Sequence, residues 1–396
     1  MRIATITFQQ DATSQMQELQ ADLAQTQNDL ATGTRLHSAA DDPAAMAQVN
    51  QLNVQMSASQ QYVTNGNYVS SSLQLEEQAM SDATNTLQGA RDLAVQANDA
   101  SLSASQRADI AAQLTQQLQN LVAIGNRVDG SGNYLFSGTA SGTVPFAQNG
   151  NTVTYSGSNQ VSQVQIGPNQ RISSGDSGAT VFMNIPAGNG TFVTSGSANN
   201  TGTGSIGVGT VTTPSAWVPD TYQISFTSPT DYTVTNSAGT VVTTGNNFQD
   251  GNSISFNGVQ IPITGTPAAG DTFTVAKAGN ASAFSTISNL ITTLNNPTLS
   301  SAQISSQIGG SLQQFDNAIS NLSNVSASVG ARINSITSSQ GAAQALQTNL
   351  TTSVSQLSDT DYAAAITQLN TEEVSLQAAQ ESYASIAKLS LFNYLQ

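Results

Sequence analysis

The sequence predicts an α+β protein in which helices at both chain ends flank an inserted antiparallel β domain. From residue 11 to residue 127 the chain has almost no proline and few glycines, and Ala, Gln and Leu are abundant. This composition favours helix. Between residues 138 and 279, Gly, Thr, Asn and Pro separate short β-branched or aromatic runs, which is typical of antiparallel strands and turns. Helix-favouring composition returns from residue 283 to the end.

Both helical regions carry apolar residues at heptad-like spacing. The N-terminal region has Met16, Leu19, Leu23 and Leu30, and later Leu114, Leu118, Leu121 and Val122. The C-terminal region has Leu346, Leu350 and Leu357, then Leu369, Leu376 and Tyr383. Such spacing forms a stripe on one helix face. The stripes are either the core of an ordinary helical bundle or a surface that needs a partner helix from a neighbouring copy.

The β region predicts strands at residues 152–155, 222–226 and 272–275. Residues 188–209 are rich in Gly, Asn and Thr, so we expect a loop or linker there, with a possible division into two lobes. The expected domains are a terminal helical assembly domain (1–40 plus 358–396), a helical rod domain (41–137 plus 283–357) and a β-rich outer domain (138–282). Two helical arms that return to each other predict an antiparallel, coiled-coil-like rod.

Composition and charge exclude several classes of protein. Only 8% of residues are charged, against about a quarter in typical proteins. The net charge is −15, with nine scattered Lys and Arg residues, so a nucleic-acid partner is not expected. The chain has no cysteine and no apolar run long enough to cross a bilayer, so we expect neither disulfides nor membrane insertion. The residues after Met1 lack the apolar segment of a secretory signal peptide.

Candidate catalytic motifs all have simpler structural interpretations. His37 is the only histidine, so it cannot join a second histidine in a metal site. The sequence GDSG at residues 175–178 resembles the nucleophile loop of a serine protease, but Ala179 follows it, and a tight turn with glycine at positive φ is the simpler expectation. Asp41, Asp42 and Pro43 suit the start of a helix better than a metal site. We therefore expect no enzyme, cofactor or metal.

Several short motifs lie where the predicted helical and β regions begin or end. LATGTRL at residues 30–36 precedes SAADDPA at 38–44, and GARIN lies at 330–334. GNYLFSGT at 132–139 contains Tyr134, Leu135, Phe136, Ser137 and Gly138. Near the C-terminus are DTDYA at 359–363, LQAAQESY at 376–383 and LSLFNYL at 389–395. In this order the motifs resemble the terminal arms of flagellins and hook-associated proteins, which form the flagellin superfamily. GDTF at 270–273 is also similar to hook-associated proteins.

Within that superfamily, the opening MRIAT, the YLFSGT motif and the ending SLF resemble the hook–filament junction family, also called hook-associated protein type three. The resemblance implies a structural adaptor that joins the hook end to the filament by helical self-assembly. The implied contacts between copies are Met16, Leu19, Leu23, Leu30, Leu369, Leu376, Tyr383, Leu389, Leu391 and Phe392. The YLFSG motif would mark the junction of rod and outer domain.

The resemblance also implies a location and partners. The protein would be exported without a cleaved signal peptide and would lie in the extracellular flagellum. Its partners would be copies of itself, the hook-capping hook-associated rod protein, flagellin, and a cytoplasmic export chaperone that binds the C-terminal helix. Filament flagellin is the nearest alternative. Two other classes stay open, namely a secreted adhesin with a ligand-binding β head and a hydrolase built on Ser177.

Overall fold

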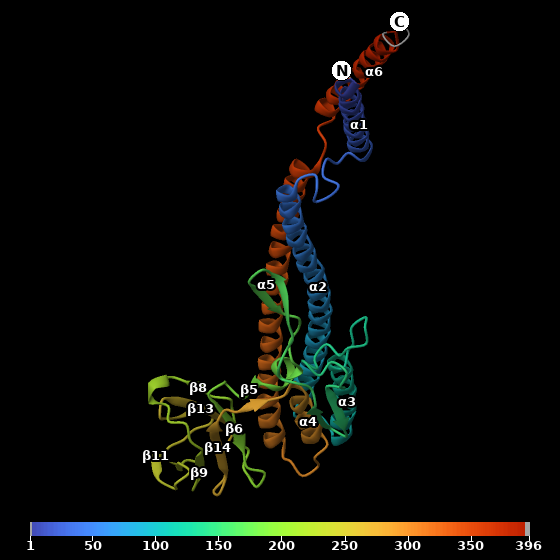
Figure 1. The fold of residues 1–396 in the computed structure, drawn as a ribbon. Helices are drawn as coiled ribbons and strands as arrows, with labels where there is room; N and C mark the ends of the chain where they lie inside the picture. The colour runs from blue at the N-terminus through green and yellow to red at the C-terminus, as the bar shows by residue number, and fades with distance from the viewer. Residues whose placement is uncertain (1, 393–396) are drawn as a thin grey trace. The chain divides into compact units, whose positions relative to one another are not determined.

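The computed structural model describes the backbone of residues 2–392 and the side chains of residues 6–385. Its helices are α1 (Arg2–Thr32), α2 (Pro43–Ala97), α3 (Ala104–Gly125), α4 (Ala283–Leu294), α5 (Ser301–Ser358) and α6 (Tyr362–Phe392). All strands lie between α3 and α4 and pair antiparallel (Figure 1). The predicted α+β class with an inserted antiparallel β domain is therefore confirmed.

The chain forms two compact units, one of residues Met1–Thr64 with Gln340–Gln396 and one of residues Asn65–Ser339. The limits of these units fall inside α2 and α5, whereas the predicted domain limits near residues 40 and 358 fall at breaks between helices. The three-domain division remains a prediction. No helix within the described residues combines the length and apolar character that a bilayer crossing requires.

In the first unit, α1 lies beside α6, and the start of α2 lies beside the end of α5 (Figure 1). The second pair is antiparallel, because Ser59 Oγ donates to the Ala343 carbonyl at 3.0 Å, whereas the earlier residue Met56 of α2 meets the later residue Thr351 of α5, with Thr351 Oγ1 3.4 Å from Met56 Sδ. A small apolar cluster packs where these two helices meet. Its buried members are Leu36, Ala45 and Val49, with Met46, Val354 and Leu357 packed against them.

In the second unit, helices α2 to α5 share one apolar core. Leu73, Met80 and Leu87 on α2 are fully buried, and so are Phe315 on α5 and Leu290 on α4. The predicted stripe on α3 belongs to this core, since Leu114, Leu118 and Leu121 have no exposed surface. Capping boxes begin the two shorter helices, with Ser103 at α3 and Ser282 at α4.

Short antiparallel pairs and one π-helical turn pack on these helices. They are β1 (Phe146–Asn149) with β2 (Thr152–Tyr155), β3 (Gln163–Gly167) with β4 (Gln170–Ser173), β5 (Ile185–Pro186) with β15 (Asn280–Ala281), and the turn η1 (Ala179–Met183). Phe146, Ile166 and Phe182 from this stretch are buried in the helical core. These strands are therefore part of the helical core.

Residues 192–277 form a separate β structure with its own core, which we call the outer β domain. One sheet has the order β11-β10-β9-β14-β6 and the other the order β12-β13-β7, with β8 also paired to β13. The strands are β6 (Phe192–Gly196), β7 (Ser205–Ile206), β8 (Thr210–Val211), β9 (Tyr222–Phe226), β10 (Tyr232–Thr235), β11 (Val241–Gly245), β12 (Ser253–Phe256), β13 (Val259–Thr264) and β14 (Thr272–Lys277). A 3₁₀ turn, η2 (Pro214–Ala216), follows β8.

The loop or linker expected at residues 188–209 is wrong, because this segment holds β6 and β7. Phe192 is fully buried in the outer β domain, and β6 pairs with β14 from Phe192↔Lys277 to Phe273↔Gly196. The run is only five residues long and its partner follows about eighty residues later. Burial and pairing with this distant strand outweigh the local Gly and Asn content.

Candidate assembly surface

The predicted heptad residues of the two terminal helices face each other. On α1, the side chains with reduced exposure recur at Ala12, Met16, Leu19, Leu23, Thr26 and Leu30. On α6 they recur at Ala365, Leu369, Glu372, Leu376, Ala379 and Tyr383. Spacings of three and four residues are those of a coiled-coil seam. Since α1 and α6 lie side by side (Figure 1), these residues form one seam between the two helices.

The α1–α6 seam is incompletely buried. Among its members only Thr26, at 5% exposure, and Ala365, at 9%, are buried, and the leucines and Met16 remain half-exposed. A pair of helices encloses less of each side chain than a larger bundle does. Leu389, Leu391 and Phe392, which the sequence also assigned to the assembly contact, lie outside the residues whose side chains the structure describes.

A second set of apolar side chains points away from the seam. Ile6 is 57% exposed, Ile366 49% and Val374 67%, and Phe8 is also exposed. The heptad argument missed these residues because they lie between the seam positions. Their signal in the sequence was an apolar residue outside the seven-residue series, at Ile366 and Val374 on a helix with few charges.

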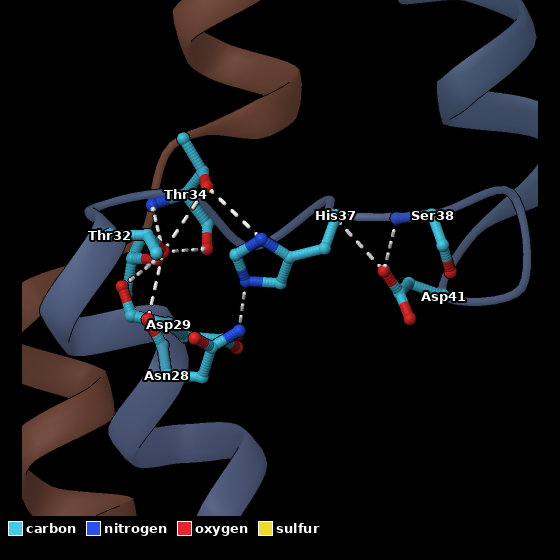
Figure 2. Close-up of polar contacts among 8 residues, drawn as sticks. Asn28, Asp29, Thr32, Thr34, His37, Ser38 and Asp41 are labelled. Carbon is cyan, nitrogen blue, oxygen red and sulfur yellow. Dashed lines mark hydrogen bonds and ion pairs between the residues drawn. The ribbon is translucent and has the colours of Figure 1, made fainter.

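The turn between α1 and α2 is held by side-chain contacts (Figure 2). His37 Nε2 lies 2.9 Å from Asp29 Oδ1, and its Nδ1 lies 3.5 Å from Thr34 Oγ1. Asp41 Oδ2 accepts from the Ser38 and His37 backbone N–H groups at 2.7 and 2.9 Å. These two N–H donors, with that of Ser38 the larger influence, lower the pKa of the Asp41 carboxyl. The only histidine therefore contributes to a turn.

The start of α2 follows directly from this turn. Asp42 Oδ1 accepts from the backbone N–H groups of Ala44 at 3.1 Å and Ala45 at 3.0 Å, and Pro43 is the first helical residue. An N-cap carboxylate and a proline at the first position are the ordinary way to begin a helix. All three members of the Asp41–Pro43 motif thus have structural roles.

The turn is also joined to the segment between α5 and α6. Thr34 and Asp359 form an antiparallel bridge, and Arg35 N donates to the Ser358 carbonyl at 2.6 Å. Arg35 Nη2 donates to the Leu357 carbonyl at 2.9 Å, at the C-terminal end of α5. A cation there also interacts favourably with the helix dipole. The segment that connects α1 to α2 and the segment that connects α5 to α6 are therefore hydrogen-bonded to each other.

In the second unit, the YLFSG motif enters an aromatic cluster. Phe136 is fully buried and its ring meets that of Phe182 edge-on at a centroid distance of 5.1 Å. Phe182 in turn contacts Phe146 and Phe284, at 5.6 Å each. Gly138 has a φ of +62°, and a Cβ there would strike the carbonyl oxygens of the segment after β2. Only glycine fits this position without strain.

The flanking members of the motif also have defined surroundings. Tyr134 N donates to the Ser141 carbonyl at 3.0 Å, and Leu135 N donates to the Arg127 carbonyl at 3.0 Å. The Ser137 hydroxyl donates to the Tyr134 carbonyl at 2.8 Å, and Ser137 itself is fully buried. The motif is thus a compact turn that leads from the end of α3 to β1.

The GDSG segment is not the tight turn with positive-φ glycine that the sequence suggested. Gly178 has a φ of −58°, and a Cβ there would lie 2.6 Å from the Phe146 ring and 2.7 Å from the Tyr155 ring. Close packing, and not an unusual φ, requires this glycine. Ser177 Oγ lies 3.0 Å from Thr180 Oγ1 and accepts from Thr180 N at 3.3 Å, so it caps the turn η1.

A buried carboxyl group lies behind the same segment. Glu76 Oε1 accepts from Asp176 N at 3.0 Å, and Arg332 forms an ion pair with the Asp176 carboxylate. Burial, reinforced by the neighbouring Asp176 charge, raises the pKa of the Glu76 carboxyl well above its usual range. Arg332, from the GARIN motif, also donates to the Gly175 carbonyl at 3.2 Å. No group of three or more His, Cys, Asp or Glu residues suited to a metal occurs within the described residues.

One face of α5 carries a row of polar side chains that donate to backbone carbonyl groups. Gln303 Nε2 donates to Ala198 at 3.0 Å, Asn317 Nδ2 to Gly188 at 2.7 Å, and Asn321 Nδ2 to Val181 at 2.9 Å. Ser306, Gln314, Arg332 and Ser339 continue the row. These donors satisfy backbone carbonyl groups at separate places between residues 166 and 206, in strands, loops and the turn η1. Sequence analysis missed this row because its members look like ordinary surface residues.

Three family models match the chain. The bacterial flagellin N-terminal helical region matches residues 3–141, and the bacterial flagellin C-terminal helical region matches residues 312–395. The D2-like domain of flagellar hook-associated protein 1 matches residues 194–277, which lie in the outer β domain.

Individual proteins give a consistent result. Flagellar hook-associated protein 3 of Salmonella typhimurium is 29% identical over 185 residues, which span 47% of this chain and 58% of that protein. FlgL of Xanthomonas campestris is 32% identical, with a TM-score of 0.71 over 77% of this chain and 99% of that chain. The flagellar junction protein FlgL from Legionella pneumophila is 30% identical, with a TM-score of 0.71 over 79% of this chain and all of that chain.

Proposed function

Because this chain belongs to the hook-associated protein 3 (FlgL) family of the flagellin superfamily, we propose that it is a structural subunit that joins the flagellar hook to the filament. It acts by self-assembly and carries out no reaction. Its place is the extracellular flagellum.

The half-buried seam between α1 and α6 is the observation that supports this proposal. Among the described residues, α1 and α6 pack mainly on each other within their unit, and large apolar side chains stay exposed on both of them. Ile6, Ile366 and Val374 each expose about half of their surface or more. Exposed apolar side chains do not stabilise a monomer in water, so a cluster of them indicates a surface that contacts another protein chain.

Neighbouring copies complete the burial that the α1–α6 pair lacks. Burying one large apolar side chain contributes about 1.5–3 kcal/mol. Ile6, Phe8, Ile366 and Val374 together therefore supply enough free energy to hold the terminal helices in an assembly. Leu389, Leu391 and Phe392 belong to the proposed contact on the basis of their sequence alone.

The proposed partners follow from the position of the junction. Copies of the chain contact one another laterally, the hook-capping hook-associated rod protein lies on one side, and flagellin lies on the other. A cytoplasmic export chaperone covers the apolar surface of α6 before secretion. The weak net amphipathicity of α6, which exposes apolar groups on more than one face, suits a helix that meets several partners in turn.

Filament flagellin is the alternative within the same superfamily. The two functions differ in the number of copies and in their place along the flagellum. The match to FlgL structures over nearly the whole of those chains favours the junction.

The experiment is a deletion strain examined by electron microscopy, with flagellin assayed in the culture medium. We expect bare hooks and flagellin monomers in the medium, because the filament would have no base on which to polymerise. Bare hooks without flagellin in the medium would instead identify the chain as the filament subunit. Normal filaments would contradict a flagellar function.

A further inference from the structure

Four asparagines of the chain are followed directly by glycine, namely Asn65, Asn149, Asn189 and Asn257. In such a pair the backbone nitrogen of the glycine can attack the amide carbon of the asparagine side chain, because glycine has no side chain that hinders the approach. Asparagine is accordingly one of the thermolabile residues of proteins. The attack needs a free glycine nitrogen, an unrestrained asparagine side chain and a backbone that can bend, and the four pairs differ in these respects.

The pairs that begin at Asn65 and Asn257 are restrained by the fold. Asn65 lies inside α2, where the backbone is helical, and its Nδ2 donates to the Gln165 carbonyl at 2.8 Å. Asn257 Nδ2 donates to the Tyr222 hydroxyl at 3.0 Å. A Cβ on Gly258 would strike a carbonyl oxygen just before η2, so this pair is also enclosed by the neighbouring segment.

The pair that begins at Asn189 is restrained at both reacting groups. Asn189 Oδ1 accepts from the backbone N–H groups of Thr191 at 3.0 Å and Phe192 at 2.9 Å. The Gly190 nitrogen donates to the Ala187 carbonyl at 3.0 Å. The side chain and the attacking nitrogen are therefore both engaged, and reaction requires the loss of these hydrogen bonds.

The pair Asn149–Gly150 lies at the turn between β1 and β2 and lacks such restraints. Both residues are exposed, and a Cβ on Gly150 would meet no atom within 4 Å. Within the part of the chain that the structure describes, neither the Asn149 side chain nor the Gly150 nitrogen has a hydrogen-bond partner. Gly150 has a φ of +59° and is the first central residue of a two-residue hairpin turn.

The β1–β2 hairpin can open at its tip while its base stays in place. β1 pairs only with β2, and each strand has four residues. A two-stranded hairpin is marginally stable by itself, and such tips open locally at little cost in free energy. At the base, Asn126 Oδ1 accepts from Phe146 N at 2.9 Å, and Asn126 Nδ2 donates to the Phe146 carbonyl at 2.8 Å. The turn can therefore bend without unfolding of the aromatic cluster that contains Phe146.

We infer that Asn149 is a site of spontaneous deamidation, a modification that does not depend on the proposed function. The Gly150 nitrogen forms a bond to Asn149 Cγ, the bond from Cγ to Nδ2 breaks, and ammonia leaves with the proton that Gly150 loses. The product is a succinimide ring. Water then adds to one of the two ring carbonyl groups and opens the ring, so that residue 149 becomes aspartate or isoaspartate. Both products add a negative charge to the hairpin, and isoaspartate also lengthens its main chain.

Peptide mapping of the purified full-length chain tests the inference. The protein is kept folded in mildly alkaline buffer, and mass spectrometry follows deamidation at each of the four pairs over days. We expect residue 149 to react at least about ten times faster than the other three asparagines, because those must first lose the hydrogen bonds that restrain them. In guanidinium chloride, where these restraints are absent, the four rates should become similar. Equal rates in the folded chain, or a faster reaction at another pair, would overturn the inference.

Two variants provide matched controls. Asn149→Gln lengthens the side chain so that the succinimide ring cannot form, and the variant should lose most of the acidic isoform that isoelectric focusing detects in the aged wild type. Tyr222→Phe removes the hydroxyl group that restrains Asn257, so it should accelerate deamidation of Asn257 and leave that of Asn149 unchanged. An acidic isoform of equal amount in Asn149→Gln would contradict the assignment of the site. An unchanged rate at Asn257 in Tyr222→Phe would contradict the protection by hydrogen bonds on which the assignment rests.

Discussion

Removing the carboxylate of Asp271 should destabilise the outer β domain selectively. Asp271 is 1% exposed, and its two oxygens accept from the backbone N–H groups of Thr201 at 2.8 Å, Gly202 at 3.1 Å and Ala268 at 2.8 Å. These bonds join the loop after β6 to the loop before β14. The variant Asp271→Ala leaves all three donors without an acceptor.

The size of the effect follows from these three donors. A buried donor left unsatisfied costs about 1–3 kcal/mol. Water can reach the partly exposed loop, so we expect a total loss of about 3 kcal/mol for Asp271→Ala, near the lower end of the summed range. Asp271→Asn keeps one acceptor oxygen and should cost about half as much.

The assay uses the single tryptophan of the chain. Trp217 lies in the outer β domain, with its ring centroid 5.5 Å from that of Phe192 and 5.6 Å from that of Tyr222. Its fluorescence during urea unfolding therefore reports this domain, while far-ultraviolet circular dichroism follows the helices. Thr240→Ala, at an exposed residue of the same domain, is the control and should leave the midpoint unchanged. The reasoning would be refuted if Asp271→Ala lowered the free energy of unfolding, measured by Trp217 fluorescence, by less than about 0.5 kcal/mol.

Three further predictions concern the helical units. A carboxyl group whose pKa is raised by folding stabilises the protein at low pH, and this stabilisation is lost as the pH rises. The variant Glu76→Gln keeps the acceptor for Asp176 N, so its free energy of unfolding should exceed that of the wild type by an amount that grows above the ordinary pKa of 4.5. A constant difference from pH 4 to pH 9 would contradict this. Val374→Lys should release flagellin into the medium without changing the melting temperature of the monomer. Val218→Lys, at a similarly exposed residue of the outer β domain, should cause no release and should also leave the melting temperature unchanged. Equal release by the two variants would count against a contact of α6 with neighbouring copies. Gly138→Ala should lower the free energy of unfolding by at least about 2 kcal/mol in a denaturant titration, because φ is +62° and the space for a methyl group is occupied; an unchanged midpoint would show that this turn relaxes freely.

Local features of the sequence were enough to predict the helical ends, the strands β2, β9 and β14, and the start of α2. Asp42 and Pro43 act through neighbours within three residues, so their roles can be read from the sequence alone. The heptad residues of α1 and α6 lie on the seam between these two helices, because a helix repeats within one chain segment, and their contact with neighbouring copies stays a prediction. Which side of each terminal helix stays exposed depends on how the pair packs, and for this reason Ile366 and Val374 were missed.

Contacts between distant segments were outside the reach of sequence reasoning. Asp271 and Thr201 are joined across 70 positions, and Asn317 and Gly188 across 129 positions. Nothing near Asn317 shows that its amide satisfies a distant backbone carbonyl group. The unusual content of neutral polar residues was the one signal of this arrangement, and only the structure shows where these residues are used.

The position of the protein along the flagellum tests the central claim most directly. Val218 is 57% exposed on the outer β domain, and the chain has no natural cysteine, so Val218→Cys can be labelled with a maleimide probe on intact cells. We expect a single labelled zone on each flagellum, at the boundary between hook and filament. Label along the whole filament, or label absent from flagella that carry filaments, would contradict the assignment as a junction subunit.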